Sequence, residues 1–317
     1  MGEWLEATGE IAINQRGTPT ITPETLTRLA QGIVTQCPQD AGYRRRHRFH
    51  EMLDNPQAVD AIRDRAELLT QIRSRLNQSG FLEVQTPILQ QQYGGASAEP
   101  FLTERNGDSL YLRISPEMHL IMLMAGGLTQ VYELGQCFRN EGADRTHNPE
   151  FTMLEFYQVN MTLAELQMMT QSLVQLAIAE TVFNTITMQE SVHQATGIYF
   201  TGDRLLRAFE RYVQPTLQTP TFVTQFPAAS SPLAQPNPQD SRWAEQFELY
   251  INGIEIANGY LSQTDPTALN DLNLDPRYIQ ALQTGMPAIA GAGIGIDRLL
   301  MLMSQIDIRD AIPFPYG

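Results

Sequence analysis

Residues 137–155 bring a cation, several carboxylates, an imidazole and an aromatic ring together in one short stretch. Its two halves read Cys137-Phe138-Arg139-Asn140-Glu141-Gly142 and His147-Asn148-Pro149-Glu150-Phe151-Thr152-Met153-Leu154-Glu155. An arginine on a strand can hold a phosphate with its guanidinium fork, while Phe151 can stack on a base and Glu141 can accept from an exocyclic amine. Taken alone, the tetrapeptide at 138–141 is better explained as a surface hairpin with ion pairs, so the interpretation depends on the rest of the chain.

A second segment, Gly291-Ala-Gly-Ile-Gly-Ile-Asp-Arg298, predicts a glycine-rich strand that enters a helix. It lacks the Lys-Ser/Thr pair of a P-loop and precedes its helix differently from a dinucleotide fingerprint. Its glycines instead allow a ligand to approach the backbone closely, and Arg298 at the start of the helix supplies a second cation. The segment alone is a weak signal for phosphate binding.

Two carboxylates, Glu248 and Glu255, lie on the strands of a predicted hairpin. The strands, 247–251 and 254–257, are joined by Asn252-Gly253, which is a strong signal for a tight turn. We expect the two carboxylates to face each other across the hairpin. Like charges in such positions repel, whereas Mg²⁺ accepts one or two protein carboxylates and completes its shell with phosphate and water. The pair therefore predicts a magnesium site, and exposure to solvent is the alternative.

Helices and strands alternate around these segments. The spacing of apolar residues and the capping signals, including the capping box Thr162–Glu165, predict helices at 56–77, 117–125 and 162 to about 180. Strands are expected at 81–84, 109–114, 130–134 and 151–159, so the first segment is a strand, a loop and a returning strand. Residues 184–220 resemble a small variable insertion. Residues 1 to about 40 alternate as strands do and are too few to bury a core.

The composition is that of an ordinary globular protein, with 42% hydrophobic and 18% charged residues in a chain of 317. The longest apolar stretch, near 120–124, is far short of the roughly 20 residues that cross a bilayer. The N-terminus lacks the regions of a secretion signal, so we expect a cytoplasmic protein with no membrane partner. Cys37 and Cys137 are too few for a disulfide framework or a cysteine zinc site.

The net charge of −14 opposes non-specific attraction to nucleic acid. One basic cluster, residues 44–48, could serve as a nucleic-acid handle. A short charge run is more often a solvated or subunit-facing helix surface, and we favour that interpretation.

Together, the segments resemble the core of the class II aminoacyl-tRNA synthetases, and within them the lysyl-tRNA synthetases and their truncated relatives. The predicted helix with Phe81–Pro87 resembles motif 1, residues 138–141 with 147–155 resemble motif 2, and residues 291–298 resemble motif 3. The resemblance covers residues 43–312, and three motifs in the family's order make it specific. It implies an α+β fold in which an antiparallel sheet is flanked by helices.

The resemblance also implies ATP and Mg²⁺ as cofactors. In the family's reaction the carboxylate of an amino acid attacks the α-phosphate in line, which releases pyrophosphate and leaves an aminoacyl adenylate. Catalysis then rests on positioning and charge stabilisation. The catalytic residues implied are Arg139 and Arg298. The ATP-binding residues implied are Arg139, Glu141, His147, Asn148, Phe151, Glu248 and Arg298, and the metal-binding residues are Glu248 and Glu255.

The amino-acid pocket implied by the resemblance is of the lysine type. It comprises Gly95, Glu117, Arg139, Glu155, Tyr157, Asn258, Tyr260, Ser262 and Gly293. In this mapping Glu117 faces the α-amino group, and Glu155 with Tyr157 faces the ε-ammonium. The family normally places a second carboxylate for the ε-ammonium where this chain has Ser262. Since losing a charged hydrogen-bond partner costs about 1.5 to 3 kcal/mol, either the affinity for lysine is lower or the natural substrate differs.

The truncated relative with the most similar architecture is the elongation factor P lysine ligase, which keeps the catalytic core and drops the anticodon-binding barrel. Residues 1–55 resemble the tail of that barrel and a linker, with too few strands to close it, and residues 56–317 would form the catalytic domain. Gly293 matches the synthetases, whereas the ligase branch has alanine at this position, so the choice between α-lysine and β-lysine stays open. Class II cores usually pair through the motif 1 helix, so residues 58–87 are expected to form the interface of a homodimer.

Three functions remain open. The first is activation of a lysine-like amino acid and its transfer to a non-tRNA acceptor, a lysine of elongation factor P. The second is activation of a different amino acid for biosynthesis or amidation, for which Ser262 is the main support. The third is a catalytically silent paralogue that binds amino acid or nucleotide, against which the retained arginines and carboxylates argue.

Overall fold

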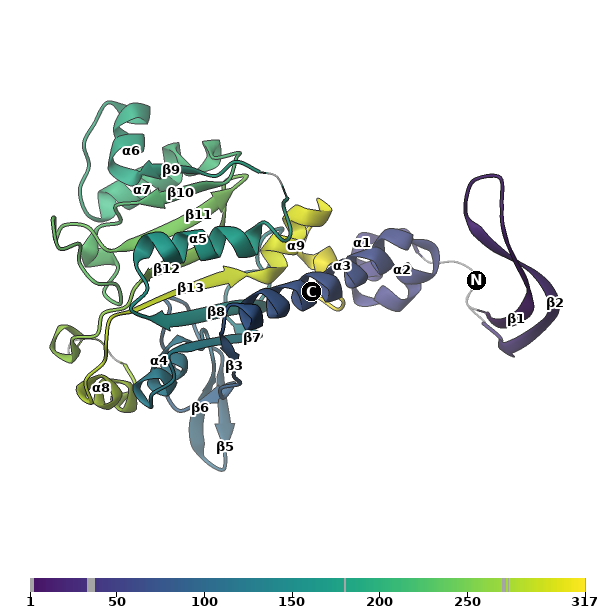
Figure 1. Cartoon of the computed structure of the whole chain (residues 1–317), viewed down its shortest axis with the longest axis horizontal. Helices are drawn as coiled ribbons and strands as arrows, with labels where there is room; N and C mark the ends of the chain where they lie inside the picture. The colour runs from purple at the N-terminus through teal and green to yellow at the C-terminus, as the bar shows by residue number, and fades with distance from the viewer. Residues whose placement is uncertain (1–2, 33–37, 180, 270–271, 273, 317) are drawn as a thin grey trace.

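The computed structural model describes residues 3–32, 38–179, 181–269, 272 and 274–316. Within these residues, the main body is a large sheet with the strand order β3-β7-β8-β13-β12-β11-β10-β9 (Figure 1). Its strands are β3 (Leu82–Glu83), β7 (Gln130–Phe138), β8 (Glu150–Val159), β9 (Asn184–Thr187), β10 (Thr221–Thr224), β11 (Gln246–Ile251), β12 (Ile254–Leu261) and β13 (Ile289–Gly295). A smaller sheet has the order β4-β6-β5, formed by β4 (Leu89–Gln90), β5 (Leu102–Arg105) and β6 (Asp108–Leu112).

The helices fall into a group that covers the large sheet and a group at its periphery. The elements are α1 (Ala41–Arg46), α2 (Arg48–Asp54), α3 (Pro56–Gln78), α4 (Glu117–Ala125), α5 (Leu163–Val174), α6 (Met188–Thr196), α7 (Asp203–Tyr212), α8 (Pro276–Gln283), α9 (Ile296–Ser304) and α10 (Ile308–Ala311). Short 3-10 turns occupy η1 (Gln214–Thr216), η2 (Ala228–Ser230) and η3 (Pro266–Leu269). None of the helices in the described part of the chain is long and apolar enough to cross a membrane.

The large sheet is antiparallel at its centre and parallel at both edges. The successive pairs from β7 to β10 are antiparallel, whereas β3 runs parallel to β7 and β9 runs parallel to β10. The predicted α+β class with a helix-flanked sheet is thus confirmed, and the sheet is mixed rather than wholly antiparallel. The connection within each parallel pair contains helices, α4 between β3 and β7 and α6 with α7 between β9 and β10, as a parallel crossover usually does.

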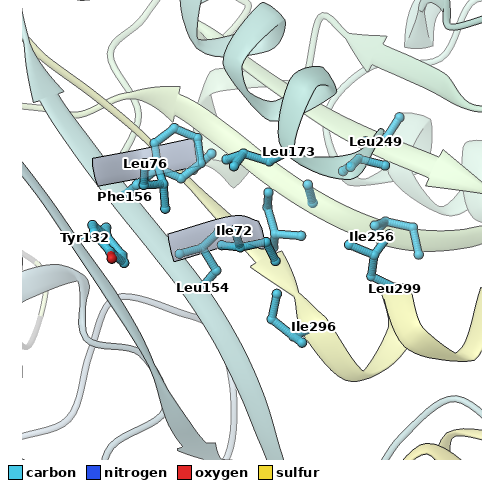
Figure 2. Close-up of a cluster of buried hydrophobic side chains, with 14 of the residues drawn as sticks. Ile72, Leu76, Tyr132, Leu154, Phe156, Leu173, Leu249, Ile256, Ile296 and Leu299 are labelled. Atoms are coloured by element: carbon cyan, nitrogen blue, oxygen red, sulfur yellow. The ribbon is translucent and has the colours of Figure 1, made fainter. Parts of the chain in front are cut away.

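One face of the sheet forms the main core against α3, α5 and α9, which lie over it in Figure 1. Figure 2 shows Ile72 and Leu76 of α3 packed near Leu154 and Phe156 of β8. Because side chains alternate along a strand, the residues between the core positions face the other side of the sheet. That second face carries the cavity described below.

The predicted hairpin and helix caps are present, and one helix end differs. Asn252 and Gly253 both have positive φ, as a tight two-residue turn demands. Thr162 and Glu165 form the predicted capping box. The helix that follows ends at Val174, earlier than the expected end near residue 180. Glu180 itself and Cys37 lie outside the described residues. Cys137 is a free, buried cysteine whose pKa burial raises to about 12, so it is not a reactive thiol.

The N-terminal strands β1 (Trp4–Ile13) and β2 (Pro19–Ala30) form a two-stranded ribbon whose side chains are all exposed. Two strands are too few to close a barrel. The basic cluster that follows is largely occupied by acids, because Arg45 pairs with Asp310 at 3.0 Å and the buried Arg48 pairs with Glu51. The favoured interpretation, a solvated or subunit-facing surface, is corrected here, because Arg48 is buried and Arg45 and Arg48 bind acids of the same chain.

Candidate functional site

A cavity of about 700 Å³ lies on the sheet face opposite the helices α3, α5 and α9. Its floor comes from residues of β8, β11, β12 and β13, and its rim from α7 and the loops around residues 94–97, 141–149 and 230–234. All but one of the residues implied by the motifs line it: Gly95, Glu117, Arg139, Glu141, His147, Asn148, Phe151, Glu155, Tyr157, Glu248, Glu255, Asn258, Tyr260, Gly293 and Arg298. The size fits a nucleotide with a small second substrate.

Arg139 follows strand β7, and its guanidinium makes no ion pair with an acid in the part of the chain that the structure describes. Its carbon Cζ lies 5.1 Å from the centroid of the Phe151 ring, and its buried Nε has no hydrogen-bond partner within the described residues. The backbone holds this position, because the Arg139 N–H donates to the Pro149 carbonyl at 2.9 Å. An unpaired buried donor is costly unless a ligand accepts from it, so Arg139 suits a carboxylate or phosphate ligand.

The loop between β7 and β8 places three further predicted residues at the rim. His147 is held by Asp144, with Nδ1 and Oδ2 2.9 Å apart, and Glu141 is exposed. Asn148 differs from expectation in that its amide is already engaged. It donates to the Glu150 carbonyl at 2.6 Å and accepts from the Tyr316 N–H at 3.3 Å. Asn148 thus fixes the loop rather than offering a free amide.

The two carboxylates of the hairpin share a face but are offset, which corrects the expected pairing. Glu248 lies opposite Asn258, and Glu255 lies opposite Tyr250, because a register shift interrupts the ladder between Leu249 and Tyr250. They remain close enough to interact: burial, and then the charge of Glu255, raise the pKa of Glu248. The Tyr250 hydroxyl donates to Glu248.

Oxygen donors of this kind fit magnesium, although they do not complete a site. The described residues contain no cluster of three or more acids, histidines or cysteines that could hold a metal. A Mg²⁺ ion at Glu248 and Glu255 would therefore need phosphate and water oxygens for the rest of its shell. Arg298 lies beside them, with Nη1 2.8 Å from the Glu255 carbonyl oxygen and 3.8 Å from its carboxylate.

Two deeply buried carboxylates, Glu117 and Glu155, occupy the other end of the cavity. Neither makes an ion pair within the described residues. Neutral hydroxyls hold them instead: Tyr260 donates to Glu117 at 2.6 Å, and Ser115 and Tyr157 donate to Glu155 at 2.7 and 2.9 Å. Burial, reinforced by Glu155, raises the pKa of Glu117 to about 8, and burial raises that of Glu155 to about 7 against the opposing hydrogen bonds.

Glycine is required where the floor meets Tyr157. A Cβ on Gly291 would lie 2.0 Å from the Tyr157 ring, which excludes any other residue there without a shift of the tyrosine. At Gly293 a Cβ would instead lie 3.6 Å from Glu155, in ordinary contact. Alanine therefore fits at position 293, where it would narrow the cavity beside the Glu155 carboxylate.

Ser262 is the one implied residue that does not line the cavity. It is buried, its N–H donates to the Ile289 carbonyl at 2.8 Å, and its hydroxyl has no partner within the described residues. Conversely, sequence reasoning missed Ser115, Tyr250 and Gln246, which line the cavity and bind its polar groups. Ser115 had a local signal, since it immediately precedes Pro116, the N-cap of α4, and its hydroxyl accepts the Glu117 N–H at 3.0 Å.

Affinity for a cationic amino acid should rise with pH. In the empty protein Glu117 and Glu155 hold protons below about pH 8 and 7, and a cation binds the ionised forms. We expect the Kd for lysine to fall at least about tenfold between pH 6 and 8.5, with proton release on binding, since one pKa unit is tenfold. Calorimetry in buffers of different ionisation enthalpy measures both the Kd and the number of protons released. A Kd that does not change over this pH range would contradict the prediction.

The raised pKa values of Glu117 and Glu155 also determine the direction in which the stability of the protein changes with pH. A carboxyl whose pKa is raised by folding stabilises the empty protein below its unfolded pKa, and that contribution is lost as the pH rises through 7 and 8. The urea midpoint of the empty protein should accordingly fall over this range, and lysine should restore it.

Residues 40–317 match the family of class II tRNA synthetases (D, K and N). The chain is 32% identical over 381 positions to the lysine–tRNA ligase of Enterococcus faecalis, and 35% identical over 382 and 383 positions to those of Thermosynechococcus vestitus and Mycoplasma pneumoniae. The alignments cover 99% of this chain and 76%, 76% and 78% of the relatives. Each of these alignments spans more positions than the 317 residues of this chain. The relatives therefore contain internal segments that this chain lacks.

Proposed function

This chain belongs to the class II tRNA synthetases (D, K and N) and is an ATP-dependent amino-acid ligase, and from that premise we propose that it activates a lysine-like amino acid as the adenylate and transfers it to a non-tRNA acceptor. We further propose that this acceptor is a lysine of elongation factor P. The cavity on the second face of the sheet is the proposed site of activation.

The observation that carries the proposal is the pair of buried carboxylates, Glu117 and Glu155, held only by neutral hydroxyls. Buried charges in proteins are normally paired. A lysine-like substrate brings two ammonium groups and one carboxylate, which match these two acids and the unpaired Arg139. A neutral amino acid would leave one acid without a partner.

The same residues account for activation. Arg139 would orient the substrate carboxylate and the α-phosphate so that attack occurs in line. Arg298 would bind the outer phosphates, and the two arginines together would stabilise the charge that develops at phosphorus. Mg²⁺ at Glu248 and Glu255 would neutralise phosphate charge. No side-chain nucleophile takes part.

The net charge of −14 supports a non-tRNA acceptor, because it disfavours the phosphate backbone. A second candidate acceptor is tRNA, and the names of the relatives favour it. The experiment is to incubate the enzyme with ATP, Mg²⁺ and radiolabelled lysine together with either elongation factor P or total tRNA. Label on the factor, lost when its loop-tip lysine is replaced by arginine, supports the proposal. Acid-precipitable label on tRNA alone would overturn it.

Amino-acid-dependent exchange of pyrophosphate into ATP tests the activation step. When all common amino acids and β-lysine are tested, we expect exchange with lysine or β-lysine. Exchange with a non-basic amino acid would support a biosynthetic or amidating ligase, and no exchange with any of them would support a silent paralogue.

Replacing Glu155 with glutamine should weaken lysine specifically. The change removes the charged partner of an ammonium group, worth about 1.5 to 3 kcal/mol, so the KM for lysine in the exchange assay should rise about 10- to 150-fold. The KM for ATP should change little. Glu150→Gln, on the exposed part of the same strand, is the matched control. Equal effects in both variants would refute the assignment of Glu155.

We also propose a homodimer through residues 58–87. Leu82 in this range is 51% exposed, Ile88 and Leu89 just beyond it are 41% and 52% exposed, and β3 is an edge strand of the large sheet. Exposed apolar side chains at a strand edge are typical of an interface. The division into a remnant at 1–55 and a catalytic domain at 56–317 is likewise a proposal.

A further inference from the structure

All 21 basic side chains counted as lysine or arginine in this chain are arginine, and none of the 317 residues is lysine. Lysine is among the commonest residues of globular proteins. Its complete absence, in a chain that keeps 21 cations, calls for a reason that distinguishes the two side chains.

Geometry explains some of the arginines. Arg45 binds Asp310 with two nitrogens, and the buried Arg113 binds Glu133, Thr86 and the Gln136 carbonyl together. Lysine cannot reproduce such forks. Other arginines have no such role: Arg16, Arg105, Arg204 and Arg207 are exposed and make no ion pair within the described residues. Lysine would serve as well there, so the pattern is an exclusion of lysine rather than a requirement for arginine.

The chemical difference is nucleophilicity. The lysine amine has a pKa of about 10.4 and is partly unprotonated near neutral pH, whereas the arginine guanidinium is always charged. An aminoacyl adenylate is a mixed anhydride. An amine attacks its carbonyl carbon and a C–N bond forms. The bond between that carbon and the phosphate oxygen breaks, and AMP leaves with the electron pair. The amine proton passes to solvent. A guanidinium cannot begin this reaction.

Arginines stand where a lysine would be at risk. Arg145 is 86% exposed and lies in the loop between Gly142 and Thr146, both of which line the cavity. Arg207 is exposed on α7, whose neighbouring residues Leu206 and Glu210 also line it. Hydroxyl groups are not avoided, because Thr146, Ser230 and Ser231 are cavity residues. The exclusion is specific to primary amines.

We propose that the adenylate of this enzyme is consumed by a primary amine of a separate molecule, and that the lysine-free chain protects the enzyme from acylating itself. The inference rests on the proposed activation step and concerns its acceptor chemistry. An adenylate exposed to an incoming amine is equally exposed to any amine at the cavity mouth, and nearby groups react at a high effective concentration.

The experiment introduces a lysine near the cavity and a matched one away from it. Arg145→Lys and Arg105→Lys both keep the charge at an exposed position, and Arg105 lies in β5 of the small sheet, outside the cavity lining. Each variant and the wild type are incubated with ATP, Mg²⁺ and lysine, and acylation is located by peptide mass mapping. Trapping with hydroxylamine measures adenylate formation in parallel.

We expect a lysyl adduct at position 145 at least about tenfold above that at position 105, and none on internal residues of the wild type. Equal amounts of adduct at both positions would also support protection from self-acylation. In that case the adenylate would react after its release from the cavity. Adenylate trapped by hydroxylamine without an adduct in either variant would overturn the proposal. No trapped adenylate in the wild type would overturn the proposed activation itself, and this inference with it.

Two small acceptors test the amine class directly. We expect N-α-acetyllysine to accelerate AMP release and to be acylated, and N-acetylserine to do neither. Preference for the serine derivative would contradict an amine acceptor, whatever the outcome with the lysine variants.

Discussion

Arg139→Ala should abolish pyrophosphate exchange while leaving the protein folded. The side chain contacts the Phe151 ring and has an unpaired Nε, whereas the hydrogen bonds that fix this segment come from its backbone. Removing one preorganised group that stabilises developing charge typically costs 100- to 1,000-fold, so we expect a loss of at least about 100-fold. Exchange with saturating lysine and ATP is the measurement.

The controls separate charge, geometry and folding. Arg139→Lys keeps the charge without the fork and should recover only part of the exchange. Arg242→Ala removes an exposed arginine that pairs with Asp240 outside the cavity and should leave exchange unchanged. The circular dichroism melting temperature of Arg139→Ala should match that of the wild type. Normal exchange in Arg139→Ala would refute the site.

Arg113→Ala should destabilise the fold more than any other single replacement considered. Arg113 and Glu133 form an ion pair with side chains 2% and 4% exposed, and Gly135 leaves the space that the guanidinium fills. Removing the arginine leaves a buried carboxylate without its cation, which typically costs about 3 to 5 kcal/mol. Because most proteins are stable by only about 5 to 15 kcal/mol, the urea midpoint should fall steeply.

A paired design distinguishes the buried charge from lost packing. Arg113→Met with Glu133→Leu removes both charges and should be more stable than Arg113→Ala, since apolar replacement of a buried pair is often neutral. The exposed pair of Arg242 and Asp240 provides the comparison, and Arg242→Ala should leave the urea midpoint nearly unchanged. A loss below 1 kcal/mol in Arg113→Ala would show that Glu133 has other compensation.

Local sequence signals predicted the parts of the site that depend on neighbours in the chain. The turn at Asn252-Gly253, the capping box at Thr162 and the glycine-rich strand before Arg298 all act within a few residues, and the structure contains each of them. The gathering of three distant segments around one cavity followed from the family resemblance, because no periodicity encodes which strands become neighbours.

The remainder depended on contacts that no local pattern carries. The offset of Glu248 from Glu255 arises from one register shift, which a hairpin signal does not report. The hydroxyls that hold the buried acids come from far away, since Tyr260 reaches Glu117 across 143 positions. Only the family resemblance assigned Ser262 to the amino-acid pocket. In the structure it hydrogen-bonds to β13 and does not line the cavity.

The alternation of side chains along β8 and β13 separates two kinds of evolutionary change. Leu154, Phe156 and Ile294 pack under the helices, whereas Glu155 and Gly293 face the cavity from the positions between them. Mutations that reshape the cavity can therefore accumulate at these intervening positions without loosening the core. Gly291 is the exception, because Tyr157 fills its side-chain space, and drift there would require both residues to change together.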